Sequence, residues 1–285
     1  MVVDFYKKDS KKKFFAYGVF MPNQVGYSLI KDYVCGGDDE IVVLKNYSLM
    51  HRNGMPMITR VQGSKTCGYL LEFCEDTARD AYNVISDSRS NSLYEWIELP
   101  IKSQRVNCLV SKAKRFGIPY YFDKYDGKHD LGFYDALNYI DRNLKSSNSI
   151  LSDEESLFFI QMNYMMLWSI IDKYTSLRYG GWGQVENVIK LSKENAFRKS
   201  LRAQIENRER MEVFSSRSSE KCTLDLNQSK KYEKSAKYYY QLRCNITHGG
   251  KTRYEEGEKV KLALEDLSKV MRDVLDDAFG ENDFI

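Results

Sequence analysis

The chain has 285 residues and a mass of 33.3 kDa, which is room for two domains of ordinary size or one large one. Charged residues make up 29% of it and the mean hydropathy is −0.54, values typical of a soluble globular protein rather than a disordered or membrane-embedded chain. The 43 lysines and arginines against 40 acids give a net charge of only +3. A basic field over the whole molecule is therefore excluded, although a local basic patch is not.

The numbers and spacing of the cysteines and histidines limit which metal and disulfide sites the chain can form. Six cysteines form no C-x-x-C pair and the chain has only three histidines, so we expect no metal site and no cofactor. His51 and His129 fit surface positions better than site positions. Reduced thiols are the simplest interpretation of the cysteine spacing, which predicts a cytoplasmic protein. The N-terminus has no signal-peptide pattern, and the most apolar stretch, 157–171, is too short to cross a bilayer, so no membrane partner is expected.

The first 120 residues predict short strands separated by turns. Apolar runs bounded by Gly, Asp or Asn indicate strands at 14–20, 41–44 and 68–73, and alternating apolar residues indicate more strands within 93–110. A helix is expected at 76–85. All four prolines of the chain lie in this part. Strands with an occasional helix, followed by a proline-free region, predict an α+β protein.

Residues 113–150 are polar and aromatic and predict a connector with a short helix near 133–144. From 151 to 285 we expect long helices. A capping-box spacing at Ser152 and Glu155 starts the first of them. This helix has one regular apolar face and a second apolar side, which suits a central helix of a bundle or one shared with a partner subunit. The second side consists of Phe158, Met162, Met165 and Met166.

A polar motif closes a later helix. The sequence from 240 to 250 reads Tyr-Gln-Leu-Arg-Cys-Asn-Ile-Thr-His-Gly-Gly, with Arg243 and His248 separated by four residues. Gly249 can end the helix, which would place His248 in its last turn. A histidine there also fits a capping cation, and lysines on a helix also fit a solvated face. Residues 228–253 nevertheless hold seven basic residues and one acid. The candidate RNA contacts are Lys234, Lys237, Lys251 and Arg253.

This motif resembles the signature of the HEPN superfamily, and most closely its Apea-like branch, over about 151–279. The resemblance implies an all-α helical bundle and a metal-independent endoribonuclease, in which two subunits bring two Arg and two His together. By this resemblance His248 transfers protons at the ribose 2′-OH, Arg243 stabilises charge on the phosphate, and Asp172 orients the arginine. Cys244 stands where the family often has Asn, and Asn245 supplies polar support. RNA, including tRNA, a homodimer and a role as toxin or antiviral effector are implied.

The segment Phe-Ala-Tyr-Gly-Val-Phe-Met at 15–21 resembles the first strand and loop of the gamma-glutamylcyclotransferase-like (AIG2-like) fold, over about 13–110. The resemblance implies a small mixed, β-barrel-like domain, assigned to 1–112. Its ligand pocket would lie around Tyr17, Gly18, Val19 and Phe20. The family's acid–base Glu is expected within 80–91, where this chain has none, and Asp87 is the candidate in its place. We therefore expect a degenerate domain that binds a small molecule, an antitoxin or another regulator.

The preferred interpretation is a homodimeric HEPN ribonuclease regulated by its N-terminal domain. One alternative is a non-catalytic RNA-binding or dimerisation module, which would share the basic patch. Another is a small-molecule enzyme or sensor that uses the N-terminal pocket.

Overall fold

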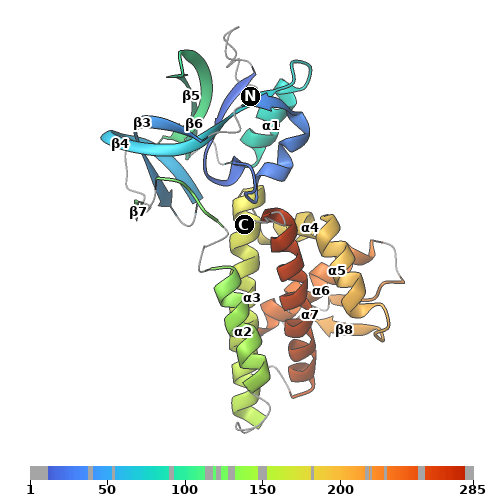
Figure 1. The fold of residues 1–285 in the computed structure, drawn as a ribbon. Coiled ribbons are helices and arrows are strands. Elements are labelled where there is room, and N and C mark those ends of the chain that lie inside the picture. The colour runs from blue at the N-terminus through green and yellow to red at the C-terminus, as the bar shows by residue number, and fades with distance from the viewer. Residues whose placement is uncertain are drawn as a thin grey trace. The chain divides into compact units, whose positions relative to one another are not determined.

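A computed structural model describes most of the chain. The chain divides into two compact units (Figure 1). The first comprises 1–128, 176–181 and 278–285, and the second 129–175 and 182–277. Strands dominate the N-terminal half and helices the C-terminal half, so the predicted α+β class is confirmed at that level. The described residues are 12–37, 41–52, 55–89, 93–112, 118–119, 123–127, 132–146, 153–180, 183–215, 218, 220–227, 230–249 and 254–279.

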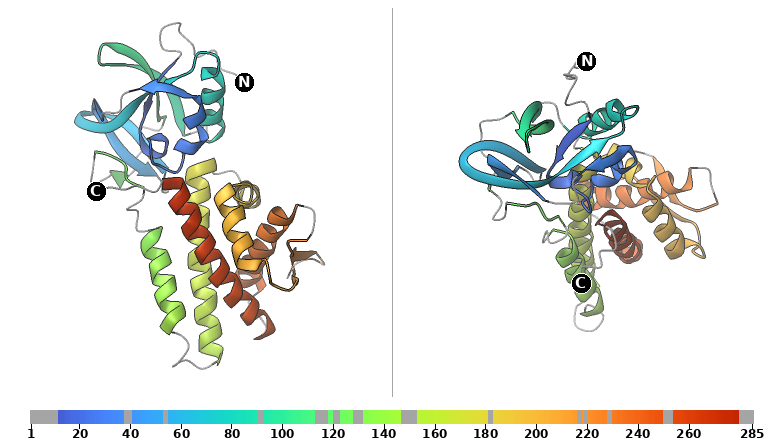
Figure 2. Two further views of the ribbon diagram at one scale, coloured as in Figure 1. Left: turned by 45° about the vertical axis from the view of Figure 1, so that its right-hand side comes forward. Right: turned by 45° about the horizontal axis from the view of Figure 1, so that its top comes forward.

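The first unit is built on a seven-stranded mixed sheet in the order β5-β6-β1-β4-β3-β7, with β2 also paired to β4. Strand β1 is antiparallel to β4 and parallel to β6. The long β3–β4 pair follows a strongly curved course (Figure 2). The strands are β1 (Lys13–Ala16), β2 (Val34–Gly37), β3 (Val42–Arg52), β4 (Met55–Phe73), β5 (Tyr94–Ile101), β6 (Gln104–Ser111) and β7 (Ile118–Pro119).

Aromatic side chains hold the helix of this unit against its sheet. Phe14 of β1 and Phe73 of β4 stack with ring centroids 5.8 Å apart. Helix α1 (Ala78–Asp87) places Tyr82 edge-on to Phe73 at 5.3 Å and to Trp96 at 5.2 Å. Edge-to-face pairs of this kind add to the stabilisation from apolar burial. The predicted helix at 76–85 is confirmed with a shift of two residues, and the run at 14–20 is a strand only as far as Ala16.

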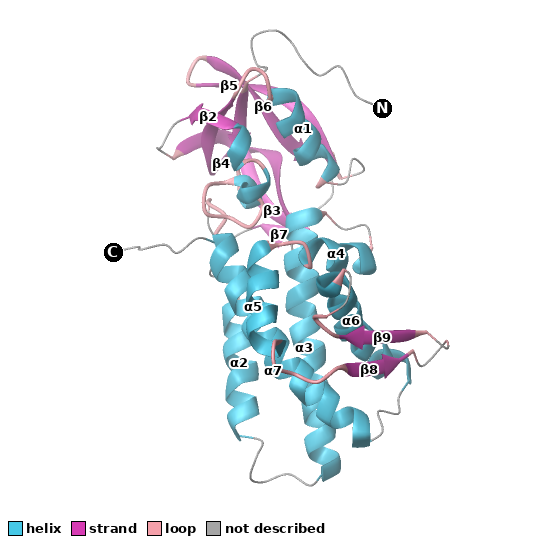
Figure 3. Ribbon diagram, turned by 90° about the vertical axis from the view of Figure 1, so that its right-hand side faces the viewer, coloured by secondary structure: helices cyan, strands magenta, loops and turns pink. Residues whose placement is uncertain are grey.

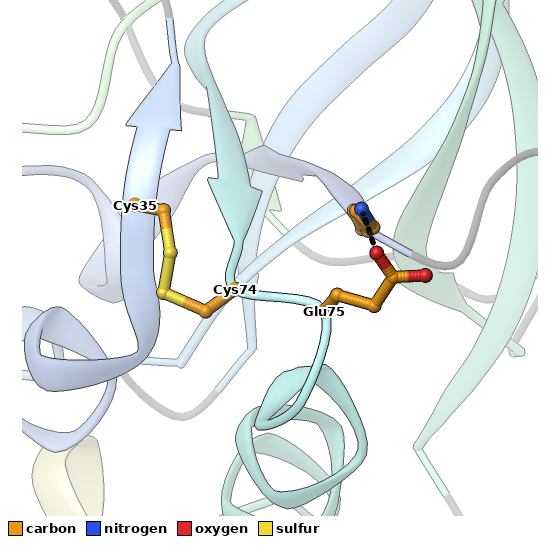
Figure 4. The surroundings of a disulfide bond; sticks show 4 residues. Cys35, Cys74 and Glu75 are labelled. Carbon is orange, nitrogen blue, oxygen red and sulfur yellow. Dashed lines mark hydrogen bonds and ion pairs between the residues drawn. A yellow bond between two sulfur atoms is a disulfide. The ribbon is translucent and has the colours of Figure 1, made fainter.

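Cys35 and Cys74 form a disulfide, which corrects the prediction that all six thiols are reduced. Strand β2 pairs with the end of β4, where Val34 lies opposite Phe73, so the two cysteines come together across a separation of 39 residues. Their Cα atoms are 5.2 Å apart, within the usual range for a disulfide. Beside it, Glu75 pairs with the Lys12 ammonium at 2.7 Å (Figure 4). Sequence spacing alone carried no sign of this pairing.

The second unit is helical but not all-α. A two-stranded antiparallel hairpin, β8 with β9, follows α5 and lies beside α6 (Figure 3). The all-α prediction is therefore wrong at 211–224, where Val213 and Leu224 bury one face of a short ribbon and leave its other face to solvent. The elements are α2 (Tyr134–Ser146), α3 (Asp153–Tyr179), α4 (Gln184–Leu191), α5 (Asn195–Ile205), β8 (Met211–Phe214), β9 (Lys221–Leu224), α6 (Lys231–Gly249) and α7 (Tyr254–Phe279).

Helix α2 lies alongside α3 and α7 rather than in a free connector (Figure 1). Arg272 of α7 donates to the Asp141 carboxylate at 2.7 Å, and Asn143 donates to the Asn163 side chain of α3 at 2.7 Å. Because these contacts join α2 to the helices of the second unit, the boundary between the two compact units falls at 128/129, inside the predicted connector 113–150. Ser152 of the predicted capping box lies outside the described residues. In the described part of the chain, no helix combines the length and apolarity needed to cross a membrane.

Candidate functional site

Helix α6 places Arg243 against α3. The helix is fixed in the unit by Tyr238, Tyr239 and Leu242, all buried. The Tyr164 hydroxyl of α3 donates to the Tyr239 carbonyl at 2.8 Å, which locks the two helices together. From this position Arg243 reaches Asp172, with Nη2 4.0 Å from Oδ2. The structure thus brings together two of the residues that the sequence assigned to one site.

The Arg243 guanidinium is largely buried, and not all of its N–H groups make hydrogen bonds within the described part of the chain. Its side chain is 15% exposed, and the buried Nε makes no hydrogen bond within the described part of the chain. The guanidinium lies 5.6 Å from the centroid of the Tyr240 ring, one helical turn before it, and Tyr240 packs edge-on against Trp168. The sequence analysis missed Tyr240 as a site residue, although its i−3 spacing from Arg243 was a usable signal. Nη2 stands 4.0 Å from the Asp172 carboxylate, beyond hydrogen-bond distance, so the Nη groups rather than the buried Nε are the donors that suit an oxyanion such as a phosphate.

Asp172 is half-buried, and burial raises the pKa of its carboxyl above the ordinary value of 3.8 although the Arg243 charge opposes this. The folded protein therefore takes up a proton at Asp172 more readily than the unfolded chain. The charged carboxylate costs stability at neutral pH, and this cost disappears as the pH falls through the raised pKa towards 3.8.

Asp172→Asn removes this titration, which gives a testable pH dependence. We expect the stability of the wild type relative to Asp172→Asn to rise as the pH is lowered from 7 to 4. Urea unfolding of both proteins at several pH values measures it, with Asp135→Asn on α2, where the side chain is exposed, as control. A stability of the wild type relative to Asp172→Asn that stays constant with pH, or falls towards pH 4, would contradict burial as the dominant influence on Asp172.

His248 lies in the last turn of α6 with its side chain exposed. It makes no hydrogen bond or ion pair within the described residues, and none joins it to Arg243. Five positions on a helix turn about 140° around the axis, so the two side chains leave α6 in different directions. A single chain therefore presents an anchored cation and a free imidazole near one helix end, without uniting them in one contact.

Asn245 is buried on the side of α6 that faces the hairpin. Its Nδ2 donates to the Phe214 carbonyl of β8 at 2.8 Å, and its Oδ1 accepts from Gln241 Nε2 at 2.8 Å. Asn245 thus ties the motif helix to the hairpin. Nothing in the sequence pointed to that partner.

The predicted RNA-contacting lysines are only partly described. Lys234 is exposed on α6, and Lys237 pairs with Glu233 at 3.3 Å along the same helix. Lys251 and Arg253 lie outside the described residues. The described part of the patch therefore holds at least one exposed lysine on the motif helix.

An exposed apolar stripe runs along α3, N-terminal to Asp172. Phe158, Met162 and Met166 are 65%, 55% and 36% exposed, and they repeat at four-residue steps. The Thr247 hydroxyl of α6 lies 3.7 Å from the Met165 sulfur, so the stripe borders the end of the motif helix. Three residues of the predicted second apolar side, Phe158, Met162 and Met166, are thus exposed to solvent in the single chain, whereas Met165 is half-buried beside Thr247.

In the first unit, Tyr17, Val19 and Phe20 line a small cavity. Gly18 sits between them with a φ of +62°, and an added Cβ would meet the Pro56 ring at 2.8 Å, so the turn requires glycine. The cavity holds about 10 Å³, room for about one water molecule. Asp87 is exposed and is not among the lining residues, which are Phe14, Tyr17, Val19, Phe20, Pro56, Arg89, Tyr94 and Leu109.

Arg89 is the charged residue of this cavity, and the sequence analysis did not single it out. It is buried over the Phe20 ring at 4.7 Å, and burial lowers the pKa of its guanidinium. Its Nη1 and Nη2 donate to the carbonyls of Ser88 and Leu177 at 2.6 and 2.7 Å. Because Leu177 lies in the last turn of α3, Arg89 acts as a capping cation for the negative end of that helix.

The comparisons with known proteins add little. No family model matches the chain, and no curated protein matches it. Among solved structures, it is similar to an uncharacterized protein, PH0828, from Pyrococcus horikoshii, at 15% sequence identity and a TM-score of 0.33, over 40% of this chain and 90% of that one. A likeness this slight carries no argument about function, so the site is interpreted from its own geometry.

Proposed function

We propose that this protein is a homodimeric, metal-independent endoribonuclease of the HEPN type, with Arg243 and His248 as its catalytic residues. The observation that carries the proposal is the anchored Arg243, held beside Asp172 with donors to spare, on the same last turns of α6 that expose His248. Arginine offers a permanent charge to phosphate oxygens, and histidine transfers protons near neutral pH. No residue in this arrangement needs a metal ion for those roles.

The reaction would be an internal transfer at one phosphate of the RNA. The ribose 2′-oxygen attacks the adjacent phosphorus as its proton passes to a neutral His248. The new bond is O2′–P, and the bond that breaks is P–O5′, whose leaving oxygen takes a proton from a protonated imidazole. Arg243 stabilises the extra negative charge on the phosphoryl oxygens as it develops. The products are a 2′,3′-cyclic phosphate and a 5′-hydroxyl end.

We infer a dimer because one chain has a single histidine in this site, whereas the reaction uses one base and one acid. The second histidine would come from a second copy of the chain. The α3 stripe of Phe158, Met162 and Met166 is where we place the second copy. It runs up to the motif helix, so a partner lying on it would bring its own Arg243 and His248 to the same region. Burying three large apolar side chains favours association by several kcal/mol before the costs of ordering.

We further propose, by analogy with the resembled families, that the protein acts in the cytoplasm as a toxin or defence effector regulated through its N-terminal unit. A stable disulfide is more typical of oxidising compartments, whereas cytosolic disulfides are mostly transient. Under the cytoplasmic proposal the Cys35–Cys74 bond would therefore be reversible.

The proposal predicts that purified protein cleaves total RNA or tRNA in the presence of EDTA and leaves 2′,3′-cyclic phosphate ends. Met162→Asp should yield a monomer by light scattering and lose cleavage, because it puts a charge in the middle of the stripe. Val185→Asp, at an exposed apolar residue of α4, is the matched control and should keep both properties. Salt-sensitive RNA binding without any cleavage products would instead identify a non-catalytic RNA-binding module.

A further inference from the structure

The β8–β9 hairpin presents one face to solvent, which we call the ribbon face. Phe214 lies directly opposite Lys221, and Glu212 opposite Thr223, so these four side chains share that face. The alternate residues Val213 and Leu224 are 1% and 3% exposed and pack inward. Phe214, in contrast, is 59% exposed. The ribbon face is thus a small surface with one aromatic ring among polar neighbours.

The ribbon face is fixed next to the motif. The Asn245 side chain holds the Phe214 carbonyl, and the Lys259 ammonium of α7 donates to the Glu212 carbonyl at 2.9 Å. These two tethers act on the backbone of β8, so they fix the strand without covering the Phe214 ring. Asn245 stands between Arg243 and His248 on α6. Around the helix axis, residue 245 lies about 160° from residue 243 and about 60° from residue 248. Phe214 is therefore held beside the last turns of α6 on the side nearer His248 and away from Arg243.

The charges around Phe214 favour an anionic ligand. Glu212 is shared by two cations, Lys221 at 3.1 Å and Arg210 at 2.7 Å, and these cations lower the pKa of its carboxyl. Lys259, bonded to the Glu212 carbonyl, adds a third positive charge and the exposed Glu220 next to Lys221 adds a second negative one, so these five described residues together carry a charge of +1. A protein partner docking on Phe214 would be expected to meet further apolar side chains, whereas the residues that share this face in the described part of the hairpin are Lys221, Glu212 and Thr223.

We propose that the ribbon face binds one unpaired base of the RNA, stacked on Phe214, with a neighbouring phosphate at Lys221. Aromatic rings stack on bases of any sequence, and a lysine beside them neutralises the backbone. A base must leave its duplex to stack in this way, so the substrate class is single-stranded or looped RNA rather than duplex. This inference rests on the proposed function, since it assigns the substrate of the same site.

The test uses RNA binding, so that it does not depend on turnover. In a His248→Ala background, a single-stranded oligoribonucleotide containing 2-aminopurine is titrated with Phe214→Ala and Phe214→Trp proteins. Phe214→Ala should weaken Kd by about 5- to 50-fold and abolish the quenching of 2-aminopurine, whereas Phe214→Trp keeps both. Tyr139→Ala, at an exposed aromatic residue of α2, should change neither. Lys221→Ala should reduce the salt dependence of binding by about one phosphate contact.

The outcomes separate this inference from the function it rests on. If wild type cleaves RNA and Phe214→Ala binds as tightly as its parent, the ribbon face is not the base platform although the ribonuclease stands. If no protein binds or cleaves RNA, the proposed function fails and the platform with it. If Phe214→Ala loses the dimer in light scattering, the ring belongs to a protein interface, which also overturns the proposal. Retention of tight binding to a duplex of the same sequence would contradict the single-strand preference.

Discussion

Replacement of His248 by alanine is expected to lower the rate of RNA cleavage by about 10³-fold while the dimer and RNA binding persist. The side chain is exposed and has no hydrogen bond within the described residues, so its removal leaves no cavity and breaks no tertiary contact. A positioned general acid–base group contributes about 10²- to 10⁴-fold. The comparison is made by single-turnover cleavage of one labelled RNA, with circular dichroism and light scattering to confirm fold and dimer.

Arg243→Lys tests the second proposed catalytic residue in the same cleavage assay. Lysine keeps the positive charge but lacks the planar fork, so it cannot hold Asp172 and a phosphate at the same time. We expect a loss of about 10²-fold, similar to the loss of one donor from an oxyanion site. Arg198→Lys is the matched control and should cleave normally, since it replaces a cation of α5 that lies over the Tyr232 ring of α6. Cleavage that survives both His248→Ala and Arg243→Lys would show that the reactive groups lie elsewhere in the protein.

The pairing of Arg243 with Asp172 illustrates what sequence could predict here. Both residues lie on segments that the sequence predicted as helices, and the resemblance supplied their roles, so their proximity needed only the correct packing of α6 on α3. The sequence also predicted that His248 lies in the last turn of its helix, and the structure has it there. The sequence could not predict which neighbouring helix each side chain of α6 faces, because that depends on which helices pack on each side of α6.

The hairpin and the disulfide show the opposite case. Strands of four residues such as β8 and β9 are too short for a period-2 pattern to stand out from a helical background. Cys35 meets Cys74 only because β2 pairs with the end of β4, a contact between segments 39 residues apart. Arg89 in the cavity likewise depends on the last turn of α3, far along the chain. Non-local pairings decide these features, and a local pattern carries no trace of them.

Asp266→Ala is expected to destabilise the second unit strongly. Asp266 of α7 is buried, forms an ion pair with Arg208 and accepts a hydrogen bond from the Tyr239 hydroxyl at 3.0 Å. It thereby joins α7, α6 and the segment that leads into the hairpin. Removing it leaves a partly buried guanidinium and a buried phenol unpaired. Breaking such a pair costs about 3–5 kcal/mol in the free energy of unfolding.

Thermal and urea unfolding followed by circular dichroism should show this loss as a fall in Tm of roughly 10 °C. Glu206→Ala breaks the exposed Arg202–Glu206 pair of α5 and should cost under about 1 kcal/mol. The double change Asp266→Leu with Arg208→Met should recover much of the loss, because it removes both charges and fills their volume. A single Asp266→Ala protein as stable as the Glu206→Ala control would mean that this network does not hold α6 in place. The position of Arg243 beside Asp172 would then have to depend on the apolar packing of α6 alone.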